Sequence, residues 1–168
     1  MEAGRLVAVA HKGDDGMRRA EREIKDKKAI EDILRQATVC RLGLCEGGMP
    51  YVVPVSFGYD DDGLYFHSAP EGRKMETIKT NPHVCFEVDV DHEFVPADTA
   101  CNWTVRFRSV IGFGKARLVE DPEEKRRALD VILEHYSDRA YEYREGALDE
   151  VALIQIQIEN ITGKQSGY

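Results

Sequence analysis

The segment whose residue types most clearly allow chemistry is His67-Ser68-Ala69-Pro70-Glu71-Gly72-Arg73-Lys74. A strand pattern ends here, the chain turns through small residues, and a helix pattern begins with a glycine followed by two cations. The free amides of a helix N-terminus attract anions, arginine adds a bidentate fork, and lysine adds a mobile charge. Gly72 would let a phosphate group approach the backbone closely. The segment therefore predicts a phosphate site at Gly72, Arg73 and Lys74, and an ordinary solvated helix start is the competing interpretation.

Two further residues stand out for their positions in predicted strands. His67 follows Tyr65 and Phe66, and a histidine side chain in this position can donate to a substrate or to a ring carbonyl. A purely structural histidine is the other interpretation. Pro54 lies inside Val52-Val53-Pro54-Val55-Ser56, and proline cannot donate to a strand ladder. This strand is therefore expected at a sheet edge, either as a plain edge or as a place where a ligand contacts the backbone.

Other common site patterns are missing from the sequence. Ser56, Ser68 and Ser109 stand in no Gly-x-Ser-x-Gly elbow, so nothing specific favours a hydrolase. The five histidines show neither His-x-His nor His-Glu-x-x-His spacing, and we expect no metal site. Trp103 has two interpretations, a cover for an aromatic ligand or a residue packed at a subunit contact.

Composition and charge limit the class of protein. The chain has 168 residues, 42% of them hydrophobic, which suits one folded domain. Its 23 Lys and Arg against 31 Asp and Glu give a net charge of −8, which argues against nucleic-acid binding. No apolar run approaches the ~20 residues of a membrane span. The acids concentrate in residues 120–150, so the rest of the chain is nearly balanced and leaves Arg73 and Lys74 free to act on an anion.

The four cysteines and the N-terminus give expectations about location and domain limits. Cys40, Cys45, Cys85 and Cys101 form no Cys-x-x-Cys pair, and we expect reduced, mostly buried thiols in a cytoplasmic protein. Residues 1–16 are expected to form a flexible N-terminal extension, with Met17 as a plausible alternative start. Residues 17–168 are expected to form a single domain.

Periodicity then predicts the elements that position these residues. Helices are expected over 18–37 with Asp26 as a possible N-cap, over 71–80, and after the N-cap Asp121. Strands are expected over 38–45, 50–58 and 64–68 as a three-stranded meander, then over 83–90, over 104–119 as one long strand or two, and over 151–161, with a polar loop over 91–102. In the last strand the alternation predicts Ile154 inside and Gln155 outside. Gly112 and Gly114 indicate a bulge or bend. The prediction is a mainly β fold with flanking helices: a six- to seven-stranded antiparallel split β-barrel of Greek-key type.

Several pieces of the sequence together resemble one known family. They are RR (18–19) before the first predicted helix, GMPYVVPV (48–55), YFHSA (65–69) with GRK (72–74), NPHVCF (81–86), SVIGFGKA (109–116) and ITGK (161–164). In this order and spacing, over about residues 17–165, the chain is similar to the FMN-binding split-barrel proteins related to pyridoxamine 5′-phosphate oxidase. It resembles most closely the Nim-type nitroimidazole-resistance branch.

The resemblance implies a homodimer with FMN in each of two clefts between subunits. It implies that Gly72, Arg73 and Lys74 hold the FMN phosphate. Two further groups would line or flank the isoalloxazine ring, namely Val53, Pro54, Val55 and Ser56, and then His67, Ser68 and Ala69, with His67 facing the flavin and the substrate. The family pattern often has Tyr where Phe107 stands, which puts a proton donor there in doubt.

The resemblance also implies a reaction class. The expected activity is that of an FMN-dependent, nitroreductase-like oxidoreductase. Reduced FMN would deliver a hydride from N5 to an electron-poor substrate such as a nitroaromatic, with His67 orienting or protonating it and NAD(P)H as a possible electron donor. Two alternatives stay open: a non-enzymatic flavin-binding or redox-sensing protein, and a pyridoxamine-phosphate-oxidase-like or deazaflavin-dependent enzyme.

Overall fold

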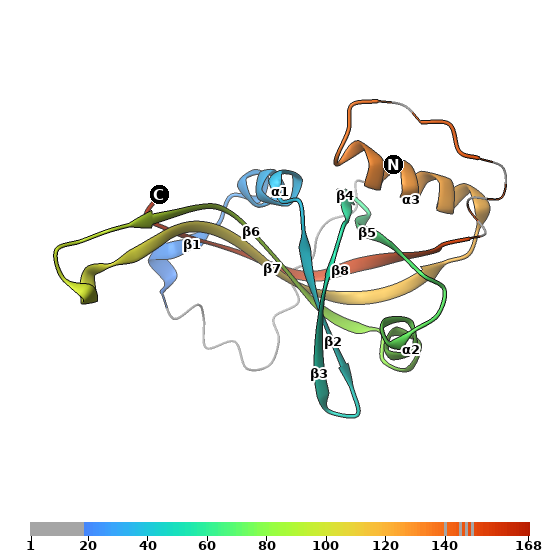
Figure 1. The fold of residues 1–168 in the computed structure, drawn as a ribbon, viewed down its shortest axis with the longest axis horizontal. Helices are drawn as coiled ribbons and strands as arrows, with labels where there is room; N and C mark the ends of the chain where they lie inside the picture. The colour runs from blue at the N-terminus through green and yellow to red at the C-terminus, as the bar shows by residue number, and fades with distance from the viewer. Residues whose placement is uncertain (1–18, 140, 145, 147, 149) are drawn as a thin grey trace.

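A computed structural model of the chain describes residues 19–139, 141–144, 146, 148 and 150–168. Within these residues eight strands form one antiparallel sheet in the order β3-β2-β6-β7-β8-β5-β4, and β1 pairs with β8 (Figure 1). The strands are β1 (Glu23–Ile24), β2 (Cys40–Glu46), β3 (Met49–Val55), β4 (Gly58–Asp60), β5 (Gly63–Ser68), β6 (His83–Val95), β7 (Thr104–Val119) and β8 (Ala152–Ser166). The predicted extension over 1–16 lies outside the described residues.

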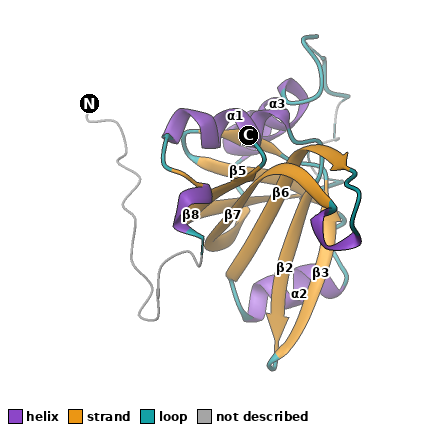
Figure 2. Cartoon of the chain, turned by 90° about the vertical axis from the view of Figure 1, so that its left-hand side faces the viewer, coloured by secondary structure: helices purple, strands orange, loops and turns teal. Residues whose placement is uncertain are grey.

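Three α-helices within the described chain flank the sheet. They are α1 (Lys27–Gln36), α2 (Arg73–Thr80) and α3 (Pro122–Glu134), and two short 3₁₀ turns cover Ala20–Arg22 and Ala100–Asn102. Helices α1 and α3 lie at one end of the curved sheet and α2 at the other (Figure 2). Both predicted N-caps are confirmed. Asp26 accepts a hydrogen bond from the Lys28 amide at 3.1 Å, and Asp121 accepts from the amides of Glu123 and Glu124 at 3.0 Å.

The sheet encloses its core by alternation along the long strands. Val84, Phe86, Val88 and Val90 of β6 are buried as predicted, and Phe66, Leu42 and Ile156 join them in one apolar cluster. This confirms a mainly β, antiparallel fold of the split-barrel class. The count of strands in the described residues is higher than predicted because β1 and β4 have only two and three residues, too few to show a period.

The predicted three-stranded meander is wrong. β3 pairs with β2 alone, and β4 pairs with β5 at the other end of the sheet order. The chain crosses between them at Phe57, which is fully buried and whose amide donates to the Tyr136 hydroxyl at 2.9 Å. A turn signal predicts only local pairing, whereas Phe57 is buried against His135 and Tyr136, just after α3, and this contact takes the chain to the far edge of the sheet.

Three predicted boundaries are also wrong. The first helix begins at Lys27 and not at 18, because the Asp26 cap starts it there, while Ile24 lies in β1 opposite Gly163. The predicted polar loop over 91–102 begins too early, since β6 continues through a bulge to Val95. The last strand continues to Ser166, past the predicted end at 161.

The thiols are less buried than expected. All four cysteines are free, but only Cys40 is buried; Cys85 is partly exposed, and Cys45 and Cys101 are exposed. Burial raises the pKa of the Cys40 thiol to about 12 and raises the pKa of Cys85 as well. The prediction of mostly buried thiols is therefore wrong for two of them.

The glycines inside β7 sit at a bend and at a close contact. The register between β7 and β8 shifts between Phe113 and Gly114, which confirms the predicted irregularity. A Cβ atom on Gly112 would lie 2.2 Å from the ring of Phe86, which is fully buried. Only glycine at position 112 leaves space for this ring against β7.

We predict that Gly112→Ala destabilises the fold by about 1–3 kcal/mol, because the added methyl group overlaps the Phe86 ring in a packed core. The measurement is chemical denaturation followed by far-UV circular dichroism. Gly43→Ala in β2 is the matched control, because its added Cβ would lie 3.3 Å from its nearest neighbour, the Cys85 carbonyl oxygen, which is a much smaller overlap. Equal effects of the two substitutions would contradict the argument.

Candidate functional site

The first turn of α2 brings together strands from distant positions in the sheet. The guanidinium carbon of Arg73 lies 4.5 Å from the centre of the Tyr51 ring, on β3. The Lys74 ammonium lies 5.4 Å from the centre of the Phe66 ring, on β5. These two strands are separated by four others in the sheet order. The predicted phosphate ligands therefore lie between the two predicted ring-lining segments.

The start of α2 is shaped by Gly72. This residue has φ 113° and ψ 169°, a conformation that favours glycine, and its carbonyl accepts from the Glu76 amide at 3.1 Å. It supplies no side-chain cap, and the space where a Cβ would stand is open to 4 Å. Met75 and Ile78 are buried and anchor the helix from the core side. The first-turn amides thus face open space beside two cations.

The two cations of this turn lack carboxylate partners within the described residues. Arg73 is exposed, and Lys74 is partly buried beside Phe66, so that burial lowers the pKa of its ammonium group. An anion placed here would restore the solvation that Lys74 has lost and would displace no existing ion pair. The turn can therefore bind an anion.

The β3 segment forms an edge of the sheet, as the proline predicted. Pro54 is exposed and lies opposite Arg41 of β2, and no strand of the described chain pairs with the other side of β3. Val53 is partly buried, Val55 is buried and Ser56 is exposed. The four residues expected to line a ring thus present one open backbone edge.

The β5 segment places its residues on two faces. His67 is exposed and lies opposite Leu153 of β8, while Ser68 is partly buried and Ala69 is exposed. Alternation puts Ser68 on the same face as Phe66 and His67 on the other. His67 therefore faces a different direction from the side chains that meet at α2.

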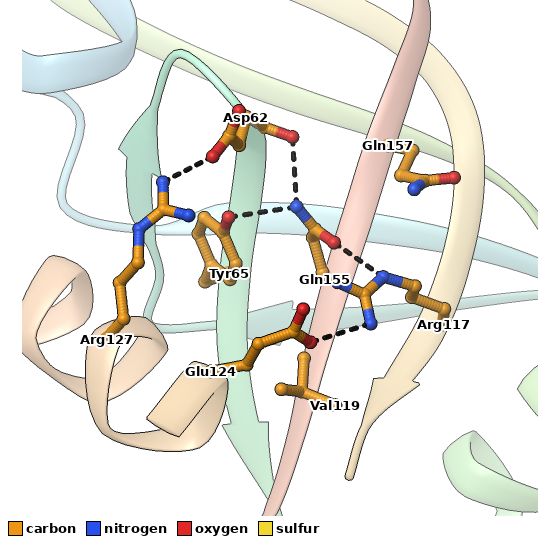
Figure 3. Close-up of a pocket in the computed structure, with 8 residues that line it drawn as sticks. All are labelled: Asp62, Tyr65, Arg117, Val119, Glu124, Arg127, Gln155 and Gln157. Atoms are coloured by element: carbon orange, nitrogen blue, oxygen red, sulfur yellow. Dashed lines mark hydrogen bonds and ion pairs between the residues drawn. The ribbon is translucent and has the colours of Figure 1, made fainter. Parts of the chain in front are cut away.

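A polar cavity of about 240 Å³ lies elsewhere, between β5, β8 and α3 (Figure 3). Its centre is Gln155, predicted to face outward but only 5% exposed. The Gln155 amide donates to the Tyr65 hydroxyl at 2.9 Å and to the Asp62 carbonyl at 3.0 Å, and its oxygen accepts from Arg117 at 2.7 Å. Burial raises the pKa of Tyr65 to about 12.

The prediction for Gln155 is wrong because α3 covers the second face of β5 and β8, so both faces are inside. The run Val151-Ala152-Leu153-Ile154 is the sequence signal that was missed, since a continuous apolar run indicates a strand buried on both faces.

The cations of this cavity are already neutralised. Arg117 pairs with Glu124 at 3.1 Å, and Arg127 pairs with Asp62 (Figure 3). Arg127 also pairs with Asp60 at 2.8 Å. These pairs fasten α3 to the sheet. Arg73 and Lys74 have no such partner in the described part of the chain, and this contrast favours the start of α2 as the site for an anionic ligand.

Two features are absent from the described part of the chain. No group of three His, Cys, Asp or Glu residues there could hold a metal ion. No helix there is long and apolar enough to cross a membrane.

Comparison with known proteins adds family evidence. Residues 26–165 match the family model described as pyridoxamine 5′-phosphate oxidase. The chain is similar to the crystal structure of a candidate 5-nitroimidazole antibiotic resistance protein from Bacteroides thetaiotaomicron, with 40% identity over 85% of this chain and 86% of that one, and a TM-score of 0.77.

Two weaker similarities are found as well. An FAD-binding protein from Mesorhizobium loti shares the fold, with 24% identity, a TM-score of 0.64, and coverage of 87% of this chain and 98% of that one. An uncharacterised protein of Rhizobium meliloti is 25% identical over 65 residues, 39% of this chain and 42% of that protein's length.

We predict that Gln155→Leu lowers the free energy of unfolding by about 2 kcal/mol or more, because the Tyr65 hydroxyl, the Asp62 carbonyl and Arg117 lose a buried partner. Gln157→Leu is the control, an exposed glutamine on the same strand and the same cavity wall. Urea denaturation measures both variants. A loss no greater than that of the control would show that the network contributes nothing.

Proposed function

Because the chain belongs to the pyridoxamine 5′-phosphate oxidase family, we propose that it is a flavoprotein that binds FMN with the phosphate at the start of α2. The observation that carries the proposal is that Arg73 and Lys74, beside the open turn at Gly72, have no carboxylate partner among the described residues. At this turn a phosphate dianion would meet free backbone amides, the guanidinium group of Arg73 and the ammonium group of Lys74.

The residues present fit the cofactor. Around Gly72 no atom of the described chain would obstruct a phosphate group where a Cβ would stand, and neither cation has to give up a carboxylate. The open edge of β3 over Val53, Pro54, Val55 and Ser56 offers a flat backbone surface for the ring. Ser68 and Ala69 would lie beside it at the end of β5. When bound, the flavin would supply hydride transfer to an electron-poor substrate such as a nitroaromatic.

His67 is the residue proposed to act on the substrate. It is exposed at the end of β5, on the face opposite to Phe66, so its imidazole is accessible to a molecule approaching from outside the barrel. Its role would be to orient the substrate or to donate a proton to it. Nicotinamide dinucleotides are the proposed electron donors.

The proposed assembly is a homodimer with the flavin in clefts between subunits. Its support is that the proposed site in one chain is open on the β3 side, where no strand of the described residues covers Pro54. FAD is the second candidate cofactor, because a protein of the same fold from Mesorhizobium loti binds it.

The first experiment measures flavin binding. We expect the purified protein to be yellow or to take up FMN, and we expect Arg73→Ala with Lys74→Ala to weaken FMN binding about 100-fold, since each charge-assisted hydrogen bond contributes about 1.5 kcal/mol or more. Fluorescence titration with FMN, FAD and riboflavin gives the affinities. The double variant should leave riboflavin affinity unchanged, because riboflavin has no phosphate.

Lys79→Ala is the matched control for this experiment, an exposed cation in the last turn of the same helix. Unchanged FMN affinity in the double variant would show that the phosphate binds at another place in the protein. A colourless protein that binds none of the three flavins would contradict the whole assignment.

The second experiment tests His67. We expect His67→Gln to keep FMN affinity within about twofold and to lower the rate of nitroaromatic reduction by NADH or NADPH about 100-fold or more, the usual effect of losing a general acid. His83→Gln, an exposed histidine on β6, is the control. Full activity in the His67 variant would exclude it from the reaction, and a wild-type flavoprotein inactive with every acceptor would favour the non-enzymatic alternative.

A further inference from the structure

The two cations at the start of α2 lie against aromatic rings. The guanidinium carbon of Arg73 is 4.5 Å from the centre of the Tyr51 ring, and the Lys74 ammonium is 5.4 Å from the centre of the Phe66 ring. The contact of Arg73 is the shortest between a cation and a ring in the described part of the chain. A cation within about 6 Å of a ring centre is attracted by the negative face of the π system.

An aromatic ring holds a cation without neutralising it. A carboxylate, such as the partner of Arg117, cancels the charge of the cation that it binds. A carboxylate also accepts N–H donors, whereas a ring accepts them only weakly. Arg73 has no carboxylate partner within the described residues. Its guanidinium group therefore keeps its charge and its donors for a ligand such as a phosphate dianion.

Tyr51 is held in place by the sheet. It lies in β3 opposite Leu44 of β2, and it shares the inner face of β3 with Val53 and Val55. It is partly buried and packs against the main apolar cluster of the core. The tyrosine is therefore a fixed support at the edge of the sheet and not a second mobile side chain.

The backbone end of Arg73 is fixed as well. Arg73 is the first residue of α2, and the buried Met75 and Ile78 anchor this helix in the core. The exposed arginine thus extends from a fixed helix to a fixed strand. A long side chain that ended free in water would lose its rotamer freedom on binding a ligand, which lowers affinity. Because the contact with Tyr51 orders the arginine when the protein folds, ligand binding no longer has to do so.

We infer that Tyr51 is a positioning residue of the proposed flavin site, whose ring holds the Arg73 guanidinium ready at the start of α2 before the cofactor binds. The phosphate of the flavin then meets a cation that is already ordered and fully charged. The inference rests on the proposed function for the identity of the ligand. It adds to that function a residue of β3 that acts on the phosphate through Arg73 and not by touching the flavin.

Two other roles for Tyr51 predict different results. A tyrosine that lined the isoalloxazine ring would contribute to the binding of FMN and of riboflavin alike. A tyrosine that only packed β3 against the core would act on flavin binding independently of Arg73. A ring that positions Arg73 affects only a ligand with a phosphate group, and only while the arginine is present.

The first test compares two flavins by fluorescence titration. Tyr51→Leu removes the ring and keeps an apolar side chain against the core. It should lower FMN affinity about fivefold, the effect of an exposed contact between a cation and a ring, and leave riboflavin affinity unchanged. Tyr51→Phe keeps the ring and should keep FMN affinity. Tyr143→Leu, which removes a ring 5.6 Å from Arg126 of α3, is the matched control and should change neither affinity.

The second test is a double-mutant cycle on FMN affinity. Arg73→Ala alone should weaken FMN binding about tenfold, because one charge-assisted contact with the phosphate is lost. Adding Tyr51→Leu to Arg73→Ala should weaken binding no further, since the ring then has no guanidinium to hold. Packing of β3 as the only role of Tyr51 would instead give the same loss in both backgrounds.

The third test uses protein without flavin and therefore does not depend on the cofactor. Nuclear magnetic resonance relaxation of the Arg73 Nε–H group measures how ordered the guanidinium is on the picosecond to nanosecond timescale. This group should be ordered in the wild-type protein and in Tyr51→Phe. It should become more mobile in Tyr51→Leu, because no ring then holds it.

The outcomes separate the inference from the proposed function. Unchanged FMN affinity in Tyr51→Leu, an equal loss of riboflavin affinity, additive effects in the cycle, or an Arg73 side chain equally mobile with and without the ring would each overturn the inference. The assignment of the phosphate to Arg73 would survive any of these results. Unchanged FMN affinity in Arg73→Ala, or a protein that binds no flavin, would contradict that assignment, and the inference would fail with it.

Discussion

The architecture depends on bringing the two ends of one sheet together. β3 and β4 are consecutive in the chain yet lie at opposite ends of the strand order, and the buried Phe57 makes the crossing between them. The first turn of α2 then lies against both ends, with Arg73 over Tyr51 and Lys74 over Phe66. The start of α2 therefore connects β3 with β5. An elongated ligand whose phosphate bound at this helix start would have room to lie along β3.

Charge separates the cations that hold the fold together from the two cations proposed to bind the cofactor phosphate. The net charge is −8, and the carboxylates around α3 neutralise Arg117 and Arg127 beside the Gln155 network. The α2 turn lies outside that network, and the partial burial of Lys74 lowers the pKa of its ammonium without giving it a counter-ion in the described chain. The charged groups of the Gln155 cavity thus hold α3 against the sheet. The first turn of α2 has fewer charges, but its cations are available to an anion.

The long strands β6 and β7 connect the core with the surface. Their inner residues pack against one another so closely that Gly112 must leave room for the Phe86 ring. Their outer face carries Ile111 of β7 beside the carboxylates of Glu87 and Asp89 of β6, and beyond the Asp91 bulge the two strands leave the body of the sheet as an arm. The same pair of strands therefore closes the core with one face and leaves the other face exposed.

The sequence by itself determined the strands with clear alternation, the caps Asp26 and Asp121, the edge position of Pro54 and the cationic helix start, because these depend on residues close in the chain. It also carried the family resemblance, which the family match over residues 26–165 confirmed. Only the tertiary structure decided that β3 and β4 separate, that Gln155 is buried, and that Phe94 joins the outer face. Each of these follows from packing between distant segments, namely Phe57 against the residues just after α3, α3 over β8, and Tyr168 on the Asp91 bulge. The periodicity and the residue propensities of a sequence do not describe such contacts.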